Sequence, residues 1–415
     1  MMNHFLMIAL VLAIPGAGVQ AQPLRTDILA GTYSQNLVRT TIGGVVSTVG
    51  SFGTHPALAM DIDNKHVLAA DGFFVIPPFR VLRIDPVSRS IVATLWSGAP
   101  FNIQILSILL DQDGDYILCE GYNPGKLYRL KADGSALTTI YIAPAGHLLS
   151  GAIEDQISGD WILSASDSMP SGGQVFLCVS RDGSTVNTIT KIPYVAVGSP
   201  MQDPHRTEIY YASGSSTFLT LEPSIGIVKS LGPSTAPLVC LTMDRSPAPS
   251  GGLIYACDRM GVLSYFDRNA RRIGTISTIA AMSLVIEHSR NIASRLVKAP
   301  NNRVIHVSFP ASAGRPFVLA LSASGYTPGL QLGDGRVIPL VLDSLTLLTS
   351  RTSIPPLLAG NVGVLDSSGG AKVTMNLNGF GSALKGVRIW AAAVTFEKNA
   401  PLGIAEISRS FLLVL

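Results

Sequence analysis

The sequence predicts an all-β protein: a six-bladed β-propeller, closed by strands from its two ends, followed by a C-terminal β-sandwich. Three observations lead to this fold class. A pattern of four short apolar strands recurs along residues 26–290. The first copy of the pattern is incomplete, and the strand that it lacks follows the last copy. From Asn291 onward short strands continue, but they no longer repeat.

The composition sets limits on the class of protein. The chain has 415 residues, of which 47% are hydrophobic and 14% are charged. Such a chain buries a substantial core, whereas disordered chains are poor in apolar residues and rich in net charge. Lys and Arg number 30 against 27 Asp and Glu. Because the basic residues are also scattered singly, we expect no nucleic-acid partner.

The first residues predict an export signal. Residues 5–14 are an unbroken apolar run, which ends at Pro15-Gly16 and is followed by the small-x-small triplet Val19-Gln20-Ala21. This layout is typical of a cleaved secretory signal, and the run is too short to span a bilayer. We therefore expect a signal peptide over residues 1–21, no membrane span, and a secreted, periplasmic or cell-surface protein. The propeller is expected over residues 22–291 and the sandwich over 292–415.

Each repeat contains the same series of elements. An apolar strand and an acidic turn lead to a second apolar strand; a short loop, a third strand with a basic or polar end, a turn and a Thr/Val/Ile-rich strand follow. The period of about 42–48 residues is that of propeller blades. The copies cover residues 57–95, 106–140, 151–189, 197–229 and 239–276.

The two ends of the repeated region complement each other. Residues 27–48 match strands two, three and four of the pattern but lack strand one, and residues 282–287 supply a first strand after the last full copy. A blade built from both ends removes open sheet edges, which would otherwise promote aggregation. With this composite blade the count is six.

The turns of the repeat have a local explanation. Asp133-Gly134 and Asp182-Gly183 lie between apolar strands, where a tight hairpin needs positive φ. Residues 111–115, Asp-Gln-Asp-Gly-Asp, resemble a calcium loop. The equivalent turns do not repeat this spacing, and no Glu follows twelve positions after Asp111. A hairpin between strands one and two is therefore favoured.

Blades such as residues 106–120, in which an apolar strand, Asp111, Gly114 and Tyr116 precede a second apolar strand, resemble those of NHL and gluconolactonase-like six-bladed propellers. Streptogramin lyases and gluconolactonases share such blades. The resemblance implies the architecture of roughly 265 residues. It implies no catalytic set, because the His/Glu residues of the lyases and the Glu/Asn/Asp metal set of the lactonases match no motif here.

The C-terminal segment predicts a sandwich of roughly 120 residues. The order of Tyr326-Thr-Pro328, Ile338-Pro-Leu340 and Leu365-Asp366 is similar to that in the terminal module of secreted planctomycete-type bacterial proteins. That resemblance implies export or surface display and no catalysis. The expected strands are residues 303–308, 316–322, 337–342, 361–365, 371–376, 387–392 and 410–415.

Six residues are candidates for a ligand site at the mouth of the propeller channel. Two histidines could bind a metal or act as acid and base, and four carboxylates could hold a cation or a polar ligand. The alternative, which we favour for each, is a loop or turn residue that bonds its own backbone. The sequence identifies no cofactor and leaves open whether a divalent cation binds. The candidates are His55 and His147 before first strands, and Asp71, Glu120, Asp167 and Asp258 after second strands.

The four cysteines are too few for a disulfide-built scaffold. Cys240 lies on a first strand and Cys257 on the second strand of the same blade, so the two could face each other across one hairpin. Export would permit a disulfide there, and the strand register decides whether it can form. Cys119 and Cys178 are expected to be buried free thiols.

Three hypotheses for the function follow. The first and favoured one is an exported propeller that binds an unknown protein or small ligand without catalysis. The second is a metal-assisted lyase or hydrolase of the streptogramin-lyase or lactonase type, acting at the channel. The third is a structural component of a bacterial surface.

Overall fold

The computed structural model divides into two compact units, one comprising Arg25–Asp244 and Gly252–His288 and the other including Ser289–Leu415. Among the described residues, no helix is long and apolar enough to cross a membrane. The structure describes residues 27–415 except 33, 35, 42, 53–56, 62–65, 72–78, 99–104, 112–113, 122, 156–157, 168–172, 194–196, 203–207, 214–216, 234–235, 244–252, 268, 280, 287–290, 297–301, 327 and 385–386.

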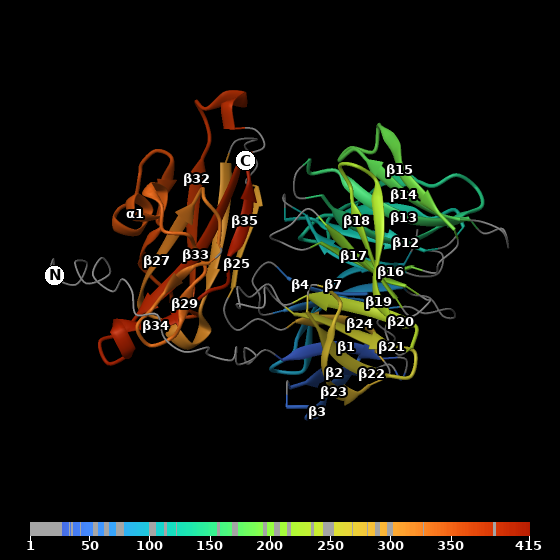
Figure 1. The fold of residues 1–415 in the computed structure, drawn as a ribbon, viewed down its shortest axis with the longest axis horizontal. Helices are drawn as coiled ribbons and strands as arrows, with labels where there is room; N and C mark the ends of the chain where they lie inside the picture. Colours follow the sequence, from blue (N-terminus) through green and yellow to red (C-terminus); the bar gives the residue numbers. More distant parts are fainter. Residues whose placement is uncertain are drawn as a thin grey trace. The chain divides into compact units, whose positions relative to one another are not determined.

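The first unit consists of antiparallel four-stranded sheets (Figure 1). Among the described residues, five sheets are built from strands that follow one another in the chain, and one joins the two ends of the unit. The joining sheet contains β24 (Ala281–Ile286), β1 (Ile28–Thr32), β2 (Asn36–Thr40) and β3 (Val46–Ser51). The next two contain β4 (Ala57–Met60), β5 (Val67–Asp71), β6 (Arg80–Asp85) and β7 (Ser90–Ser97), and β8 (Ile105–Leu110), β9 (Tyr116–Glu120), β10 (Lys126–Leu130) and β11 (Leu137–Ile142).

The remaining sheets of this unit have the same order of strands. They contain β12 (His147–Glu154), β13 (Trp161–Asp167), β14 (Gln174–Val179) and β15 (Val186–Ile192); β16 (Val197–Gln202), β17 (Ile209–Ser213), β18 (Thr217–Glu222) and β19 (Ile227–Pro233); and β20 (Leu238–Met243), β21 (Ile254–Asp258), β22 (Val262–Phe266) and β23 (Arg272–Thr278).

Burial explains the composition of the strands. The second strands β9 and β21 are buried along their whole length, whereas the fourth strands β3 and β23 are mostly exposed. A strand covered on both faces carries apolar residues at successive positions, and an outer strand with one covered face retains Ser and Thr. This difference produces the repeat that is visible in the sequence.

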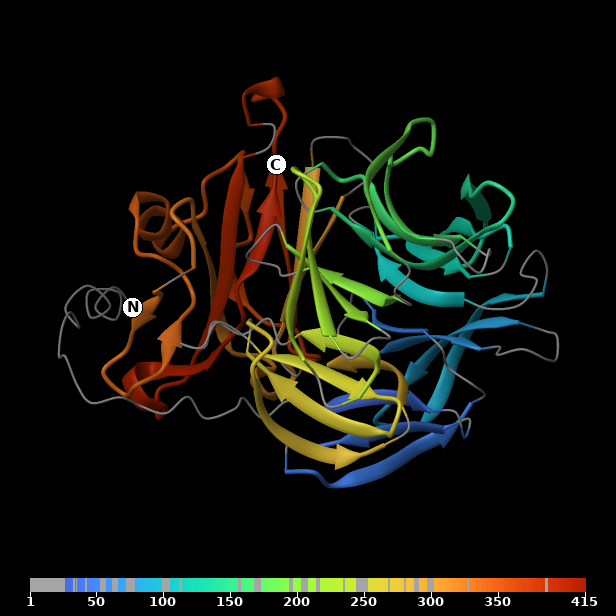
Figure 2. The same ribbon diagram turned by 45° about the vertical axis from the view of Figure 1, so that its right-hand side comes forward.

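Neighbouring sheets are joined through their first strands and through apolar cores. β24 contacts both β20 and β4, and the other first strands contact one another in chain order. The core between the last sheet and the joining sheet includes Tyr255, Ile28, Leu284 and Ile286. Both views show the blue strands of residues 28–51 beside the yellow strands of residues 254–286 (Figures 1 and 2). The two ends of the unit therefore share one sheet and one core.

Glycines in four of the described turns between third and fourth strands pack against the preceding sheet: Gly44, Gly134, Gly183 and Gly226. Gly134 and Gly183 have positive φ, as the Asp-Gly pairs predict. A Cβ at Gly183 would lie 1.9 Å from the carbonyl oxygen of Ile140, and one at Gly44 would lie 2.4 Å from that of Ile276. Only glycine combines this backbone conformation with so close an approach.

The second unit has two sheets. One contains β25 (Asn291–Leu296), β26 (Asn302–Ser308), β32 (Gly370–Asn376) and β30 (Leu358–Ala359). The other contains β31 (Val362–Val364), β27 (Pro316–Ser322), β33 (Arg388–Phe396) and β34 (Ile404–Ile407), with β35 (Phe411–Val414) also paired to β33. A short ribbon joins β28 (Leu330–Gln331) to β29 (Val337–Ile338). The helices are α1 (Ser344–Arg351) and the 3-10 turns Pro310–Ser312, Gly381–Leu384 and Pro401–Gly403.

The two sheets share one apolar core, which includes Ile305 and Val373 from one sheet and Phe317, Leu319 and Leu413 from the other. This packing of two sheets across a common core is that of a sandwich.

The second unit differs from the sequence prediction in several elements, among them β28, β30 and α1, which were not expected. The expected strand over residues 337–342 is reduced to β29, because the chain turns toward α1, whose first turn is capped by the Asp343 carboxylate. β25 already begins at Asn291 and pairs with β26. β34 pairs with β33 along a segment where no strand was expected.

Candidate functional site

In each described sheet of the first unit, the second strand ends on a polar residue. We call this set the second-strand rim; its members are Thr32, Asp71, Glu120, Asp167, Ser213 and Asp258. The register places each of them across from the start of a neighbouring strand, as in the pairs Ile105–Glu120 and His147–Asp167. Four of the six candidates that the sequence suggests therefore occupy equivalent positions.

Glu120 is buried and bonded within its own sheet. The Tyr128 hydroxyl donates to its Oε2 at 2.8 Å, and Nζ of Lys126 lies 3.9 Å from the same oxygen. Burial and the adjacent Glu120 carboxylate raise the pKa of the Tyr128 hydroxyl, which therefore stays a hydrogen-bond donor. Glu120 is a fixed, charge-compensated group of the rim.

Asp258 caps the loop that follows its strand. Its Oδ1 accepts hydrogen bonds from the backbone N–H groups of Met260 and Val262, each at 2.9 Å. This is the turn function that the sequence favoured for the rim carboxylates.

His147 is half-buried at the first position of β12, directly across from Asp167. The loop that follows Glu120 reaches this segment: Gly125 N donates to the His147 carbonyl at 3.0 Å, and Gly146 N donates to Oδ1 of Asn123 at 2.9 Å. The structure thus brings the Glu120 end of one sheet beside the His147 end of the next.

The other two candidates are less fully described. Asp71 ends β5 and pairs with Arg80 of β6, but its side chain, like that of Asp167, lies outside the described residues. His55 lies outside them altogether. Among the residues that the structure describes, no group of three or more His, Cys, Asp or Glu side chains is arranged to hold a metal ion.

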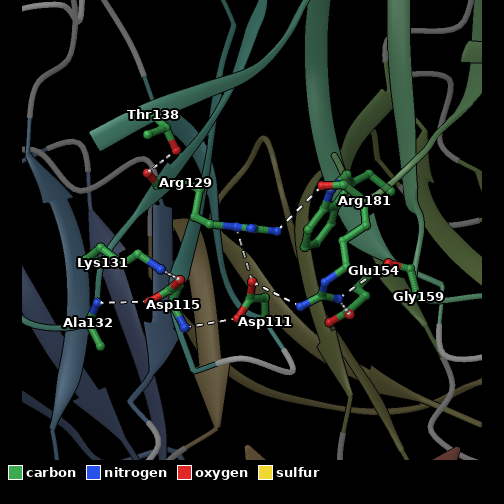
Figure 3. A network of polar contacts seen from close by, with 10 residues as sticks. Asp111, Asp115, Arg129, Lys131, Ala132, Thr138, Glu154, Gly159 and Arg181 are labelled. Atoms are coloured by element: carbon green, nitrogen blue, oxygen red, sulfur yellow. Dashed lines mark hydrogen bonds and ion pairs between the residues drawn. The ribbon is translucent and has the colours of Figure 1, made fainter. Parts of the chain in front are cut away.

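At the opposite end of the sheets the structure contains a polar network that the sequence did not indicate (Figure 3). Asp111, buried at the end of β8, has its Oδ2 3.5 Å from Nε of Arg129 and 3.2 Å from Nη2 of Arg181. Nη1 of Arg181 lies 2.5 Å from Oε1 of Glu154, and its guanidinium lies over the Trp161 ring. Because Arg129 and Arg181 belong to different sheets, one carboxylate joins two sheets.

The network includes both ends of the turn over residues 111–115, of which residues 112–113 lie outside the described residues. Oδ1 of Asp111 accepts from Asp115 N, which closes the turn, and the Asp115 carboxylate lies 2.7 Å from Nζ of Lys131. Both carboxylates have partners on the protein, and β8 pairs with β9 on either side of this turn as in the expected hairpin.

Similar contacts join other pairs of sheets. Asp61 after β4 lies 2.6 Å from Nε of Arg83, and both groups bond the hydroxyl of Tyr116 in the next sheet. Asp155 after β12 accepts from Gln202 of the following sheet at 3.4 Å. The sequence did contain a signal for these contacts. An Asp follows each of the first strands β4, β8 and β12, and an Arg lies in the third strands β6 and β10. This pattern gives the residue types but not which residues pair.

The predicted cysteine pair meets in register. Cys240 of β20 is directly across from Cys257 of β21, and both are buried free thiols. Cys119 is buried and free, as expected, whereas Cys178 is free but only half-buried. The disulfide itself stays a prediction.

No protein-family model and no curated protein matches the chain. Solved structures do match. A chain of a nidogen/laminin complex matches with a TM-score of 0.52 and 14% identity, over 63% of this chain and 98% of that chain. A Bacteroides fragilis protein, provisionally described as a 6-phosphogluconolactonase, matches with a TM-score of 0.44 and 10% identity, over 65% and 99%. The first match supports the β-propeller fold of the first unit.

Proposed function

We propose that the chain is an exported binding protein, a closed six-bladed propeller that presents its second-strand rim to a partner. Three features support a closed ring: the sheet shared by β24 and β1, the contacts of β24 with β20 and β4, and the approach of Gly44 to Ile276. In this proposal each four-stranded sheet is one blade, and the sandwich serves display or assembly.

One observation favours binding over catalysis. The described rim carboxylates are bonded separately, each within its own sheet: Glu120 to the Tyr128 hydroxyl and Asp258 to two backbone N–H groups. Both carboxylates are buried and fixed in place, so they hold the strand ends rigid, while more exposed residues of the same end, such as the half-buried His147, provide the contacts to a protein or a polar ligand. The chain with the similar fold comes from a complex between proteins, which supports a protein as the partner.

Site-specific photo-crosslinking in the producing cell tests the proposal. A photoreactive residue replaces His147 at the rim and, in a matched control, Asp133 in an exposed turn at the other end of the sheets. We expect a discrete adduct from position 147 and none from position 133. Equal crosslinking from both positions, or none from 147, would contradict a binding rim. Many identical adducts between copies of the chain would favour the structural surface component.

A second measurement addresses the enzyme alternative. The purified full chain is incubated with lactones and with Zn²⁺, Mg²⁺ or Ca²⁺, with His147→Ala as the comparison. Turnover that needs the metal and is lost in the variant would replace binding by a metal-assisted hydrolase or lyase. Export is tested separately by sequencing the N-terminus of the released protein, which should begin at Gln22.

A further inference from the structure

Cys240 and Cys257 occupy the position on neighbouring strands from which a disulfide can form. Directly opposed residues of an antiparallel pair have Cα atoms about 4.5–5.5 Å apart, which lies within the roughly 4.4–6.8 Å that a disulfide requires. Both side chains lie in the core between the last sheet and the joining sheet, at 3% and 0% exposure. Two of the four cysteines in 415 residues are thus brought face to face.

The thiols also contact the segment that leads into β24. Sγ of Cys257 donates to the carbonyl of Ile279 at 3.1 Å, and Sγ of Cys240 donates to that of Ala281 at 3.8 Å. Burial raises the pKa of the Cys240 thiol, and the neighbouring Cys257 thiol adds to this rise.

The chain contains a natural comparison for this pair. Cys119 is the penultimate residue of β9, as Cys257 is of β21, and an irregularity of the register adjoins both pairs. The residue across from Cys119 is Ser107, which bonds the Cys119 thiol. The same position of the repeat therefore holds a serine–cysteine pair in one sheet and a cysteine–cysteine pair in another.

We propose that Cys240 and Cys257 are a redox site that forms a disulfide between β20 and β21 while the chain folds in an oxidising compartment. The oxidant is a small or protein disulfide. The thiolate of one cysteine attacks one of its sulfurs and releases the first oxidant thiolate, which takes up a proton. The thiolate of the other cysteine then attacks the protein sulfur of this mixed disulfide, forms the intramolecular bond and releases the second oxidant thiolate, which also takes up a proton. Two electrons pass from the protein to the oxidant.

The timing follows from burial. Neither sulfur is accessible in the folded unit, so the exchange has to precede the packing of β24 over the pair. Once formed, the bond closes a loop of roughly 18 residues and restricts the unfolded chain. This inference does not depend on the rim, and its failure would leave the proposed binding function untouched.

The test counts thiols in the full chain after export, or after refolding with oxidised and reduced glutathione. The protein is denatured with an alkylating reagent and without reductant, and its peptides are then mapped. We expect a linked peptide containing Cys240 and Cys257 and two free thiols, which are the four cysteines less the linked pair. Four free thiols, or a link that involves Cys119 or Cys178, would overturn the proposal.

Two variants provide matched controls. Cys119→Ser removes a buried thiol that has no cysteine across from it, and the linked peptide should persist. Cys240→Ser recreates the Ser107–Cys119 pair at the second site, and the linked peptide should disappear. Reductant should lower the Tm of the wild type and of Cys119→Ser by about 5 °C and should leave Cys240→Ser unchanged. If Cys240→Ser does not fold, the thiol counts of the wild type and of Cys119→Ser still decide the outcome.

Discussion

Nη2 of Arg181 lies 3.2 Å from Oδ2 of Asp111, and the two residues are 70 positions apart on neighbouring sheets. The Asp111 side chain is fully buried, whereas about a quarter of the Arg181 side chain is exposed. Arg129 completes the arrangement from the same sheet as Asp111. A buried carboxylate is tolerated because two guanidinium groups compensate its charge.

Asp111→Asn should therefore lower the stability of the propeller unit. The amide keeps the volume of the side chain and can still accept from Asp115 N, but it removes the counter-charge beside Arg129 and one of the two carboxylates that pair with Arg181. Because both arginines are partly exposed, we expect a loss of about 2 kcal/mol, less than for a fully buried pair. Guanidinium unfolding measures it, with Asp133→Asn in an exposed turn as the control. Equal midpoints for the two variants would contradict the assigned role.

Tyr116→Phe removes a hydroxyl that serves two partners. It donates to Oδ1 of Asp61 at 3.0 Å and accepts from Nη2 of Arg83 at 2.6 Å. We expect a loss of about 1–3 kcal/mol, because both partners are left incompletely bonded. Tyr141→Phe, at a half-buried tyrosine of β11, is the control and should change the unfolding midpoint less.

The raised pKa of Tyr116 also predicts that the folded protein loses stability at alkaline pH. Burial, followed by the charge of Asp61, raises its pKa above that of an unfolded tyrosine, which is about 10. The folded state thus holds its proton more tightly, so this contribution is complete below pH 10 and is lost as the pH rises toward the folded pKa. Between pH 10 and pH 11, the free energy of unfolding of Tyr116→Phe should therefore decline less than that of the wild type. Parallel profiles for the two proteins would disprove the assignment.

Gly44→Ala tests the contact between the first and last sheets. The substitution imposes a side chain on φ of +82° and places its Cβ 2.4 Å from the Ile276 carbonyl oxygen. Gly98→Ala is a matched control, because Gly98 has φ of +100° but, among the described residues, no atom within 4 Å of the added Cβ. Backbone strain of about 1–2 kcal/mol is common to both variants. We expect Gly44→Ala to lose a further 1–3 kcal/mol or so from overpacking, measured by thermal unfolding. The same loss in both variants would argue against ring closure.

Asp343→Ala should destabilise the sandwich unit at neutral pH. Burial alone would raise the Asp343 pKa, but hydrogen bonds from Thr346 N, Ser324 N and two hydroxyl groups outweigh it and lower the pKa well below its usual range. Loss of this helix cap should cost about 1–2 kcal/mol at pH 7.

The pH dependence of Asp343 has a definite sign. Since the folded pKa is depressed, its contribution is present above the unfolded pKa of about 3.9 and is lost as the pH falls through the folded value. The difference between wild type and Asp343→Ala should therefore shrink below pH 4. Urea unfolding at several pH values measures it, and a constant difference would be evidence against an ionic cap.

The strands were predictable where burial is uniform. β9 and β21 are covered on both faces, and their sequences read as apolar runs. α1 was missed because its sequence, Ser-Leu-Thr-Leu-Leu-Thr-Ser-Arg, mixes Leu with Ser and Thr, and its helical start depends on one capping carboxylate. β25 was missed because Ser294 and Arg295 interrupt its apolar residues, Ile292, Ala293 and Leu296, and because its pairing comes from β26.

At the second-strand rim, too, the sequence predicted the positions of residues but not their contacts. That Glu120 and Asp258 end their strands follows from the repeat, but their partners do not. Tyr128 reaches Glu120 from the next strand, and that contact depends on the register of β9 with β10. His147 meets the loop after Glu120 only because two sheets pack side by side.

The sequence by itself determined what depends on neighbours along the chain: the alternation of buried and exposed strands, the positive φ at Gly134 and Gly183, and the position of an acid after the first strands. Only the tertiary structure decided which charges compensate one another and which cysteines face each other. Asp111 and Arg181, like Cys240 and Cys257, are brought together by register and by the packing of sheets. These distances depend on the whole unit, because shifting one strand by a single residue would turn its side chains to the other face.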